Sequence, residues 1–146
     1  YCNAILSSVT SSRLRLLQPV QNVCARFVRR LPRRSPTSSA IRDLHWLPVP
    51  KRFQFKLCCP IHKCVHGNAP TYLKDLISDS PSSSAPMYLR SRSCIRLLQR
   101  IATNKAGTGA FAIAGPRLWN ELPNHIQLTS DFVLFKCKLK TFLFSK

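Results

Sequence analysis

Acidic residues are scarce in this sequence. Five aspartates and glutamates stand against 23 lysines and arginines, so the 146-residue chain carries a formal net charge of +18. The acids are Asp43, Asp75, Asp79, Glu121 and Asp131, and no two of them are adjacent. Two-metal phosphoryl-transfer chemistry needs clustered carboxylates to hold the ions. We therefore expect no polymerase or nuclease centre in this chain.

Signals for membranes, secretion and nucleotide binding are also missing. No apolar run approaches the ~20 residues of a membrane span, and no basic stretch followed by an apolar run opens the sequence as a secretory signal would. Glycine occurs four times, and "AGTGA" at 106–110 lacks the Lys-Ser/Thr pair that completes a phosphate-binding loop. Seven cysteines occur without one CxxC pair. We expect no membrane partner, and reduced thiols in a nuclear or cytoplasmic protein that is not secreted.

Hydrophobic residues make up 45% of the chain and eleven prolines interrupt it. This composition predicts a mainly α fold, a small fragment of about five to six helices joined by short rigid connections. The segment "SDSPSSSAP" at 78–86 has no hydrophobic pattern. We therefore expect two lobes: a basic helical lobe at 1–77, a Ser/Pro-rich linker at 78–87, and a C-terminal lobe at 88–146 that ends in an amphipathic helix. The run 88–105 fits a strand as well as a helix.

The helical period predicts where the individual helices lie. The first is expected over 11–31, about five turns long, ended by Pro32 and either kinked or started late at Pro19, which lacks a backbone donor. Further helices are expected near 39–47, over 51–67 with Gly67 as the C-cap, after Pro70, around 116–122, and from 129 onward. The predicted core stripes are Leu14, Leu17, Cys24, Phe27, Val28 and Leu31 on the first helix, and Phe132, Phe135, Leu139 and Leu143 on the last.

Positive charge of this density predicts a polyanionic partner, most often RNA or DNA. The candidate contacts are the basic residues of the first helix and of the loop after it, Arg15, Arg26, Arg29, Arg30, Arg33 and Arg34, with Arg52, Lys56, Arg90 and Arg92 as additions. Such side chains contact phosphates, so shape and charge matter more than base sequence. Trp46 and Trp119 are base-stacking candidates, although their Leu and Pro neighbours favour core anchors. A basic fragment whose compensating acids lie elsewhere in a larger protein is the alternative.

The stretch "CCPIHKCVHGN" at 58–68 is the densest group of potential metal ligands in the sequence. On a helix, Cys58, His62 and His66 share one face, but Cys58 and His66 then lie about 12 Å apart along the axis, too far for a single ion. At most two ligands, such as Cys58 and His62, come from this stretch. We therefore expect no metal site and no cofactor, and a buried helix in which the cysteines act as small hydrophobes.

Eight phrases follow one another along nearly the whole chain. They are "YCNAIL" (1–6), "LQPVQNVCAR" (17–26), "LHWLPV" (44–49), "RFQFK" (52–56), "GNAPTYL" (67–73), "LRS" (89–91), "GPRLWNELP" (115–123) and "FKCKLKTFLF" (135–144). In order and spacing they resemble the region downstream of the polymerase core in reverse transcriptases of LINE-type (non-LTR) retrotransposons. The resemblance implies a helical C-terminal region that follows the fingers, palm and thumb and helps to hold RNA template or target DNA.

The same resemblance bears on catalysis and on the alternatives. The catalytic carboxylates of that family lie upstream, so the resemblance implies a non-catalytic fragment whose protein partner is the rest of the reverse transcriptase polypeptide. Pro19 and Pro60 fall inside expected helices, where proline is costly, and Pro60 departs from the family's pattern. An inert retroelement relic, marked by poor folding, is therefore one alternative. A protein-interaction module that completes a larger polymerase, marked by a broad exposed apolar patch, is the other.

Overall fold

The computed structural model describes residues 11–77, 96–99, 101 and 110–145, and these residues contain helices and no strands. In chain order they are α2 (Ser11–Arg15), α3 (Gln18–Val28), α4 (Ser38–Asp43), α5 (Val49–Val65), α6 (Thr71–Ile77), α7 (Phe111–Asn120), α8 (Asn124–Gln127) and α9 (Phe132–Ser145). The predicted mainly α fold is confirmed. The predicted linker at 78–87 and most of the undecided run 88–105 lie outside the described residues.

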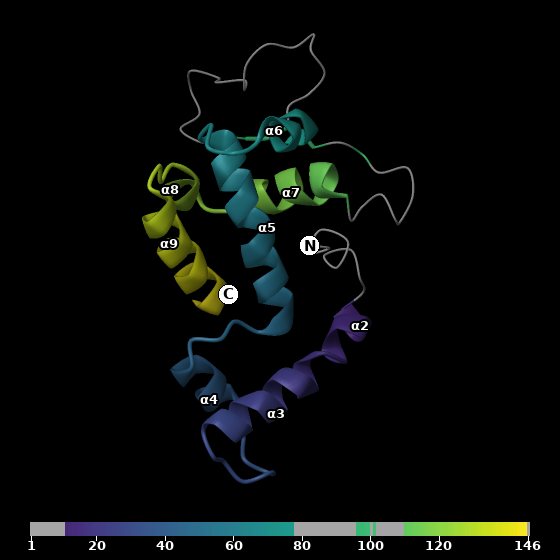
Figure 1. Cartoon of the computed structure of the whole chain (residues 1–146), viewed down its shortest axis with the longest axis vertical. Helices are drawn as coiled ribbons and strands as arrows, with labels where there is room; N and C mark the ends of the chain where they lie inside the picture. The colour runs from purple at the N-terminus through teal and green to yellow at the C-terminus, as the bar shows by residue number, and fades with distance from the viewer. Residues whose placement is uncertain (1–10, 78–95, 100, 102–109, 146) are drawn as a thin grey trace.

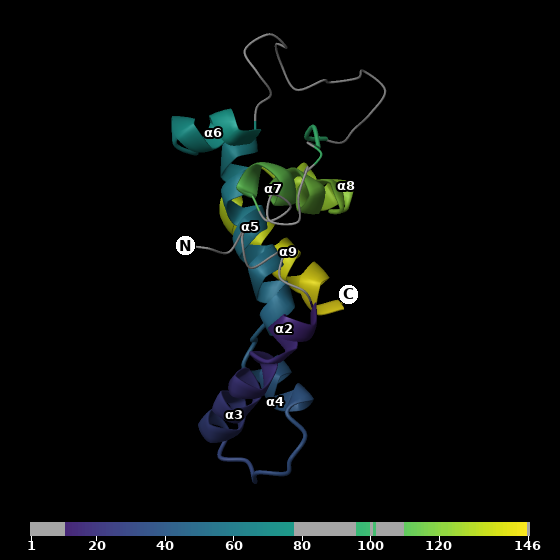
Figure 2. The same ribbon diagram turned by 90° about the vertical axis from the view of Figure 1, so that its right-hand side faces the viewer.

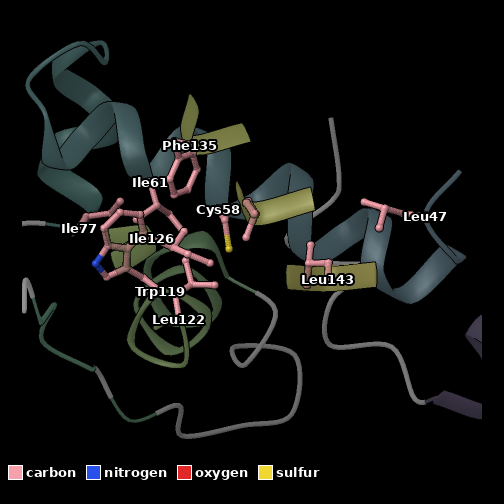
Figure 3. Close-up of a cluster of buried hydrophobic side chains, with 10 residues drawn as sticks. Leu47, Cys58, Ile61, Ile77, Trp119, Leu122, Ile126, Phe135 and Leu143 are labelled. Atoms are coloured by element: carbon pink, nitrogen blue, oxygen red, sulfur yellow. The ribbon is translucent and has the colours of Figure 1, made fainter. Parts of the chain in front are cut away.

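Helix α5 runs through the middle of the molecule, with α9 beside it and α7 crossing it (Figures 1 and 2). Its apolar side chains join those of α6 to α9 in the main core (Figure 3), whose buried members are Leu47, Cys58, Ile61, Ile77, Trp119, Leu122, Ile126, Phe135, Leu139 and Leu143. The core stripe predicted for the last helix is confirmed, apart from the half-buried Phe132. Residues from both sides of 78–87 thus share one core, and the division into two lobes stays a prediction.

The centre of this core is built around Trp119. Its side chain is fully buried and stacks on Phe135, with ring centroids 5.9 Å apart, so the interpretation of Trp119 as a core anchor is confirmed. Helix α7 reaches α5 closely at Gly115, where a Cβ atom would lie 3.1 Å from Ile61 Cδ1. Trp46 is half-buried and packs against a second, smaller cluster between α3 and α4, which is a structural position as well.

The first predicted helix is divided in two near Pro19. The N–H groups of Leu16 and Leu17 bond three residues back, to Arg13 and Leu14, so the chain makes a turn after α2. Helix α3 then begins at Gln18 with Pro19 in its first turn, where the missing N–H of proline costs nothing. The late start expected at Pro19 is confirmed.

Helix α3 ends at Val28, about one turn before the expected stop at Pro32. Arg30 adopts a left-handed conformation with φ of 51°, its N–H donates to the Phe27 carbonyl, and the Leu31 N–H donates to the Arg26 carbonyl at 2.9 Å. This pattern is the Schellman motif, which usually places glycine at the left-handed position. Arg30 therefore follows the helix, and the prediction of one helix that extends to residue 31 is wrong at this end.

Two other helices end with the same motif. Helix α4 ends at Asp43 rather than the expected Leu47, and His45 takes the left-handed position with φ of 51°. Helix α5 ends next to Gly67, which has φ of 78°, so the predicted C-cap at Gly67 is confirmed. Only the last of these three positions is occupied by the residue type that accepts this conformation without strain.

The stripe predicted to bury α3 is wrong for most of its length. Leu14 of α2 is buried, but Cys24, Phe27 and Val28 are exposed, and the buried residues of α3 are Gln21 and Ala25. The reason is the way α3 is attached to its neighbours. The short helix α4 covers only the side of α3 that contains Ala25. In addition, the side chains of Gln18 and Gln21 form hydrogen bonds with the backbone just before and at the start of α5, which hold their side of α3 toward α5.

Candidate nucleic-acid interface

The loop between α3 and α4 lies at one end of the molecule (Figures 1 and 2). The sequence from Gln18 to His45 contains six arginines and one acid, Asp43, which gives this part of the chain a net charge of +5. Five predicted contact residues belong to the last turn of α3 and to this loop, and we refer to them as the arginine tip: Arg26, Arg29, Arg30, Arg33 and Arg34. The structure therefore brings this half of the predicted set into one short segment.

Two members of the arginine tip also hold the loop in place. Arg26 is half-buried, and its Nε–H donates to the Ser35 carbonyl at 3.1 Å. Arg29 places Nη2 2.8 Å from Oδ2 of Asp43, and both side chains are about half exposed. An exposed ion pair of this kind contributes at most about 1 kcal/mol and is screened by salt. A phosphate can therefore compete for Arg29 at little cost.

The remaining three members of the tip, Arg30, Arg33 and Arg34, are exposed. Arg42, on α4 next to Asp43, is exposed as well, and it belongs to the same end of the molecule because α4 packs against α3. Arg42 was not among the predicted contacts. The sequence does contain a signal for Arg42, because this arginine belongs to the stretch from Gln18 to His45 in which Asp43 is the single acid.

The other predicted contacts do not belong to the tip. Arg15 is exposed on α2, and Arg52 and Lys56 are exposed four residues apart, on one face of the first half of α5. Helix α2 contacts α5, so these three residues form a second set, the α2–α5 group. Arg90 and Arg92 lie outside the described residues.

A third basic surface, on α5 and α9, was not predicted. Lys63 Nζ lies 4.7 Å and Lys136 Nζ 4.8 Å from the ring centroid of Phe132, within cation–π range. Lys138 donates to Oγ1 of Thr129 at 3.1 Å. The repeated lysines of "FKCKLK" are the sequence signal for this surface, but their spacing of two residues does not place them on one helix face.

The two metal-ligand candidates, Cys58 and His62, occupy the main core. Burial raises the pKa of the Cys58 thiol to about 12, so it stays protonated. Burial also lowers the pKa of His62, whose Nε2 lies 2.7 Å from the Thr129 carbonyl and whose ring stacks on Phe135 at 4.1 Å. A neutral imidazole that donates Nε2–H to this carbonyl accounts for the contact.

Within the described part of the chain, no three His, Cys, Asp or Glu side chains gather in a way that could hold a metal ion. Across the same residues, no helix is long and apolar enough to cross a membrane. Part of the "CCPIHKC" stretch belongs to the core, where Cys58, Ile61 and His62 are among the most buried side chains.

Side chains from several of the phrases that carry the family resemblance form hydrogen bonds within the fold. In "LQPVQNVCAR", the Gln21 amide donates to the Leu47 carbonyl at 2.8 Å, and Gln18 Oε1 accepts from the Val49 N–H at 3.0 Å, both within "LHWLPV". In "GPRLWNELP", Asn120 accepts from the Leu97 N–H and donates to its carbonyl. These hydrogen bonds between side chains and backbone maintain the fold.

Comparison with known proteins adds no identification. No family model, curated protein or solved structure matches the chain.

Proposed function

We propose that this chain is a non-catalytic nucleic-acid-binding segment that contacts RNA or DNA through the arginine tip. The observation that carries the proposal is the concentration of arginines at one end of the molecule, where Asp43 is the single acid between Gln18 and His45. The resemblance to the C-terminal region of LINE-type reverse transcriptases supports the same partner. On this proposal the rest of a reverse transcriptase polypeptide supplies the polymerase chemistry.

Phosphate contacts explain how such a surface works. Each guanidinium group presents several N–H donors in a planar fork that matches phosphate oxygens. Arg30, Arg33 and Arg34 are exposed along a loop, so they can follow a sugar–phosphate backbone without reading bases. Binding through about six phosphates gives a slope near −4 for log affinity against log salt on single strands.

The non-catalytic part of the proposal rests on where the described acids lie. Asp43 pairs with Arg29, and Glu121 lies 3.8 Å from Arg117, one turn away on α7. Asp75 and Asp131 are on α6 and just before α9. Four carboxylates distributed in this way do not provide the paired ligands that two-metal phosphoryl transfer requires.

The test compares two variants that lose the same charge. Arg30, Arg33 and Arg34 become alanine in the first, and the α2–α5 group becomes alanine in the second. Anisotropy of a labelled single-stranded RNA, recorded between about 50 and about 200 mM salt, gives the slope for each protein. The proposal expects the slope to become shallower by about 2 in the first variant and to change by less than half as much in the second.

Circular dichroism on the same samples and a heparin competition complete the experiment. Equal changes in both variants would show a diffuse electrostatic attraction and would contradict a localised interface. An unfolded wild-type chain, or one that binds RNA and heparin indistinguishably, would favour the inert-relic alternative. Unchanged slopes in both variants would place the interface elsewhere, and the Lys63–Phe132–Lys136 surface would be the next candidate.

A further inference from the structure

Helix α3 presents a row of large apolar side chains to solvent. Phe27 is 84% exposed, and Val20 and Val23 are each 61% exposed. Together with their exposed neighbours, two of which lie in the turn just before the helix, these residues form what we call the apolar face of α3: Leu16, Leu17, Val20, Val23, Phe27 and Val28. Single exposed hydrophobic residues are common, whereas six within thirteen positions are a concentration of the kind that marks an interaction site.

The spacing shows that this patch is one side of the helix. Leu17, Val20, Val23 and Phe27 follow one another at intervals of three or four residues, which places them along a single line. Ala25, which packs against α4, lies well round the helix from this line. Helix α3 contacts α2 and α4 and lies toward one end of the molecule (Figure 1). The side chains of its apolar face are exposed.

The charges around the apolar face favour one kind of partner. Arg13 and Arg15 precede the row, and Arg30 follows it, all three exposed. A second copy of the chain, packed either parallel or antiparallel, would bring arginines against arginines. Asp43 is the only acid in this part of the sequence and already pairs with Arg29. A partner with carboxylates near both ends of an apolar contact is therefore the complementary one.

An anionic membrane surface fits the same charges less well. A helix that lies in a membrane interface carries basic side chains beside its apolar face, where they reach the headgroups. The two arginines within or capping α3, Arg26 and Arg29, are instead hydrogen-bonded to Ser35 and Asp43 in the loop and on α4. The remaining positive charges lie at the two ends of the row rather than along its edges.

We propose that α3 is a docking helix whose apolar face lies in a hydrophobic groove of another protein, with carboxylates at both ends of that groove. The helix-in-groove mode of recognition uses anchors at this spacing, and Phe27 is the largest and most exposed of them. The proposal goes beyond nucleic-acid binding, because the apolar anchors are not members of the arginine tip. Arg30 alone belongs both to the tip and to the charged ends of the row.

The probe for this proposal is a designed two-helix hairpin with a leucine-lined groove and glutamates at both groove ends. Its matched versions carry lysine in place of those glutamates, or glutamine in place of the leucines. Each labelled hairpin is titrated with the full chain and binding is followed by anisotropy. The glutamate–leucine hairpin is expected to bind at least tenfold more tightly than either matched version.

Protein variants locate the contact. Phe27→Ser and, separately, Val20→Ser should weaken hairpin binding about tenfold or more. The control Val133→Ser/Leu134→Ser, which removes exposed apolar side chains from α9, should leave hairpin binding unchanged. RNA affinity should stay the same in all three, which separates a failure of this proposal from a failure of the nucleic-acid proposal. Circular dichroism should show unchanged helicity, since every altered side chain is exposed.

Four outcomes would overturn the proposal. The first is that the hairpin does not bind, and the second is that the lysine version binds as well as the glutamate version. The third is sedimentation of the free chain as a dimer that Phe27→Ser dissociates, because a second copy would then cover the face. The fourth is binding to phosphatidylserine-containing vesicles that Phe27→Ser abolishes while hairpin binding persists.

Discussion

Replacing Arg30 with glycine should stabilise the protein while weakening its hold on nucleic acid. Arg30 has a φ of 51° because it takes the left-handed position that ends α3. It is also one of the exposed residues of the arginine tip. A single substitution therefore relieves an unfavourable backbone conformation, which raises stability, and removes a proposed phosphate contact, which weakens nucleic-acid binding.

The magnitudes follow from these two roles. A non-glycine residue in the left-handed region costs about 1–2 kcal/mol, and the greater freedom of glycine in the unfolded chain offsets about 0.4–1 kcal/mol of the relief. Arg30→Gly should thus raise the free energy of unfolding by about 1 kcal/mol, which raises the midpoint of thermal unfolding by roughly 3 °C for a chain of this size. Loss of one phosphate contact should make the salt slope on single-stranded RNA shallower by about 0.7.

Arg33→Gly is the matched control. Arg33 is exposed in the same loop and has the same charge, but its φ is not positive. The control should lose the same 0.7 in salt slope and should gain no stability. Urea and thermal unfolding followed by circular dichroism, together with RNA anisotropy, measure both quantities. The reasoning would be refuted if Arg30→Gly were no more stable than Arg33→Gly.

Three further predictions concern the core. Burial lowers the pKa of His62 below its ordinary value of 6.5. As the pH falls, this imidazole is therefore protonated in the unfolded chain before it is protonated in the folded protein. Stability should therefore fall as pH drops below about 6.5, and His62→Leu should weaken that dependence in urea unfolding. Phe135→Ala should cost about 3–5 kcal/mol in the same assay, and a loss under 1 kcal/mol would contradict its central position. Mass spectrometry after brief alkylation should find Cys24 and Cys137 modified but Cys58 protected until the protein unfolds.

Periodicity and special residues predicted the parts of the fold that depend on local sequence. The stripe of α9 repeats Phe135, Leu139 and Leu143 one turn apart, and these side chains are buried as expected. Gly67 ends α5, and α3 starts with Pro19 in its first turn, because each residue has a backbone preference that few neighbours can override.

The orientation of α3 could not be predicted in this way. An apolar stripe shows which side of a helix is able to enter a core, but not whether a neighbour is there to receive it. Here Gln18 and Gln21 bond to the backbone at the start of α5, some 26–31 residues away, and they turn the stripe that contains Phe27 outward. No local sequence pattern predicts such contacts between distant segments.

The candidate site was predicted in part for the same reason. The density of arginines identified the tip, since its members are close in sequence. The separation of Arg15, Arg52 and Lys56 from that tip depends on how α2 and α5 pack. The left-handed position of Arg30 carried no signal either, because glycine or asparagine normally marks that position.

The most direct test of the nucleic-acid interface is to map it on the folded chain. We would record backbone and arginine side-chain NMR spectra of the ¹⁵N-labelled full chain while adding a single-stranded RNA of about ten nucleotides at about 50 mM salt, where phosphate contacts are strong. The proposal predicts that the largest shifts fall on residues 26–34 and that α8 and α9 change little. Shifts centred on α9, or spread evenly over all basic residues, would contradict it.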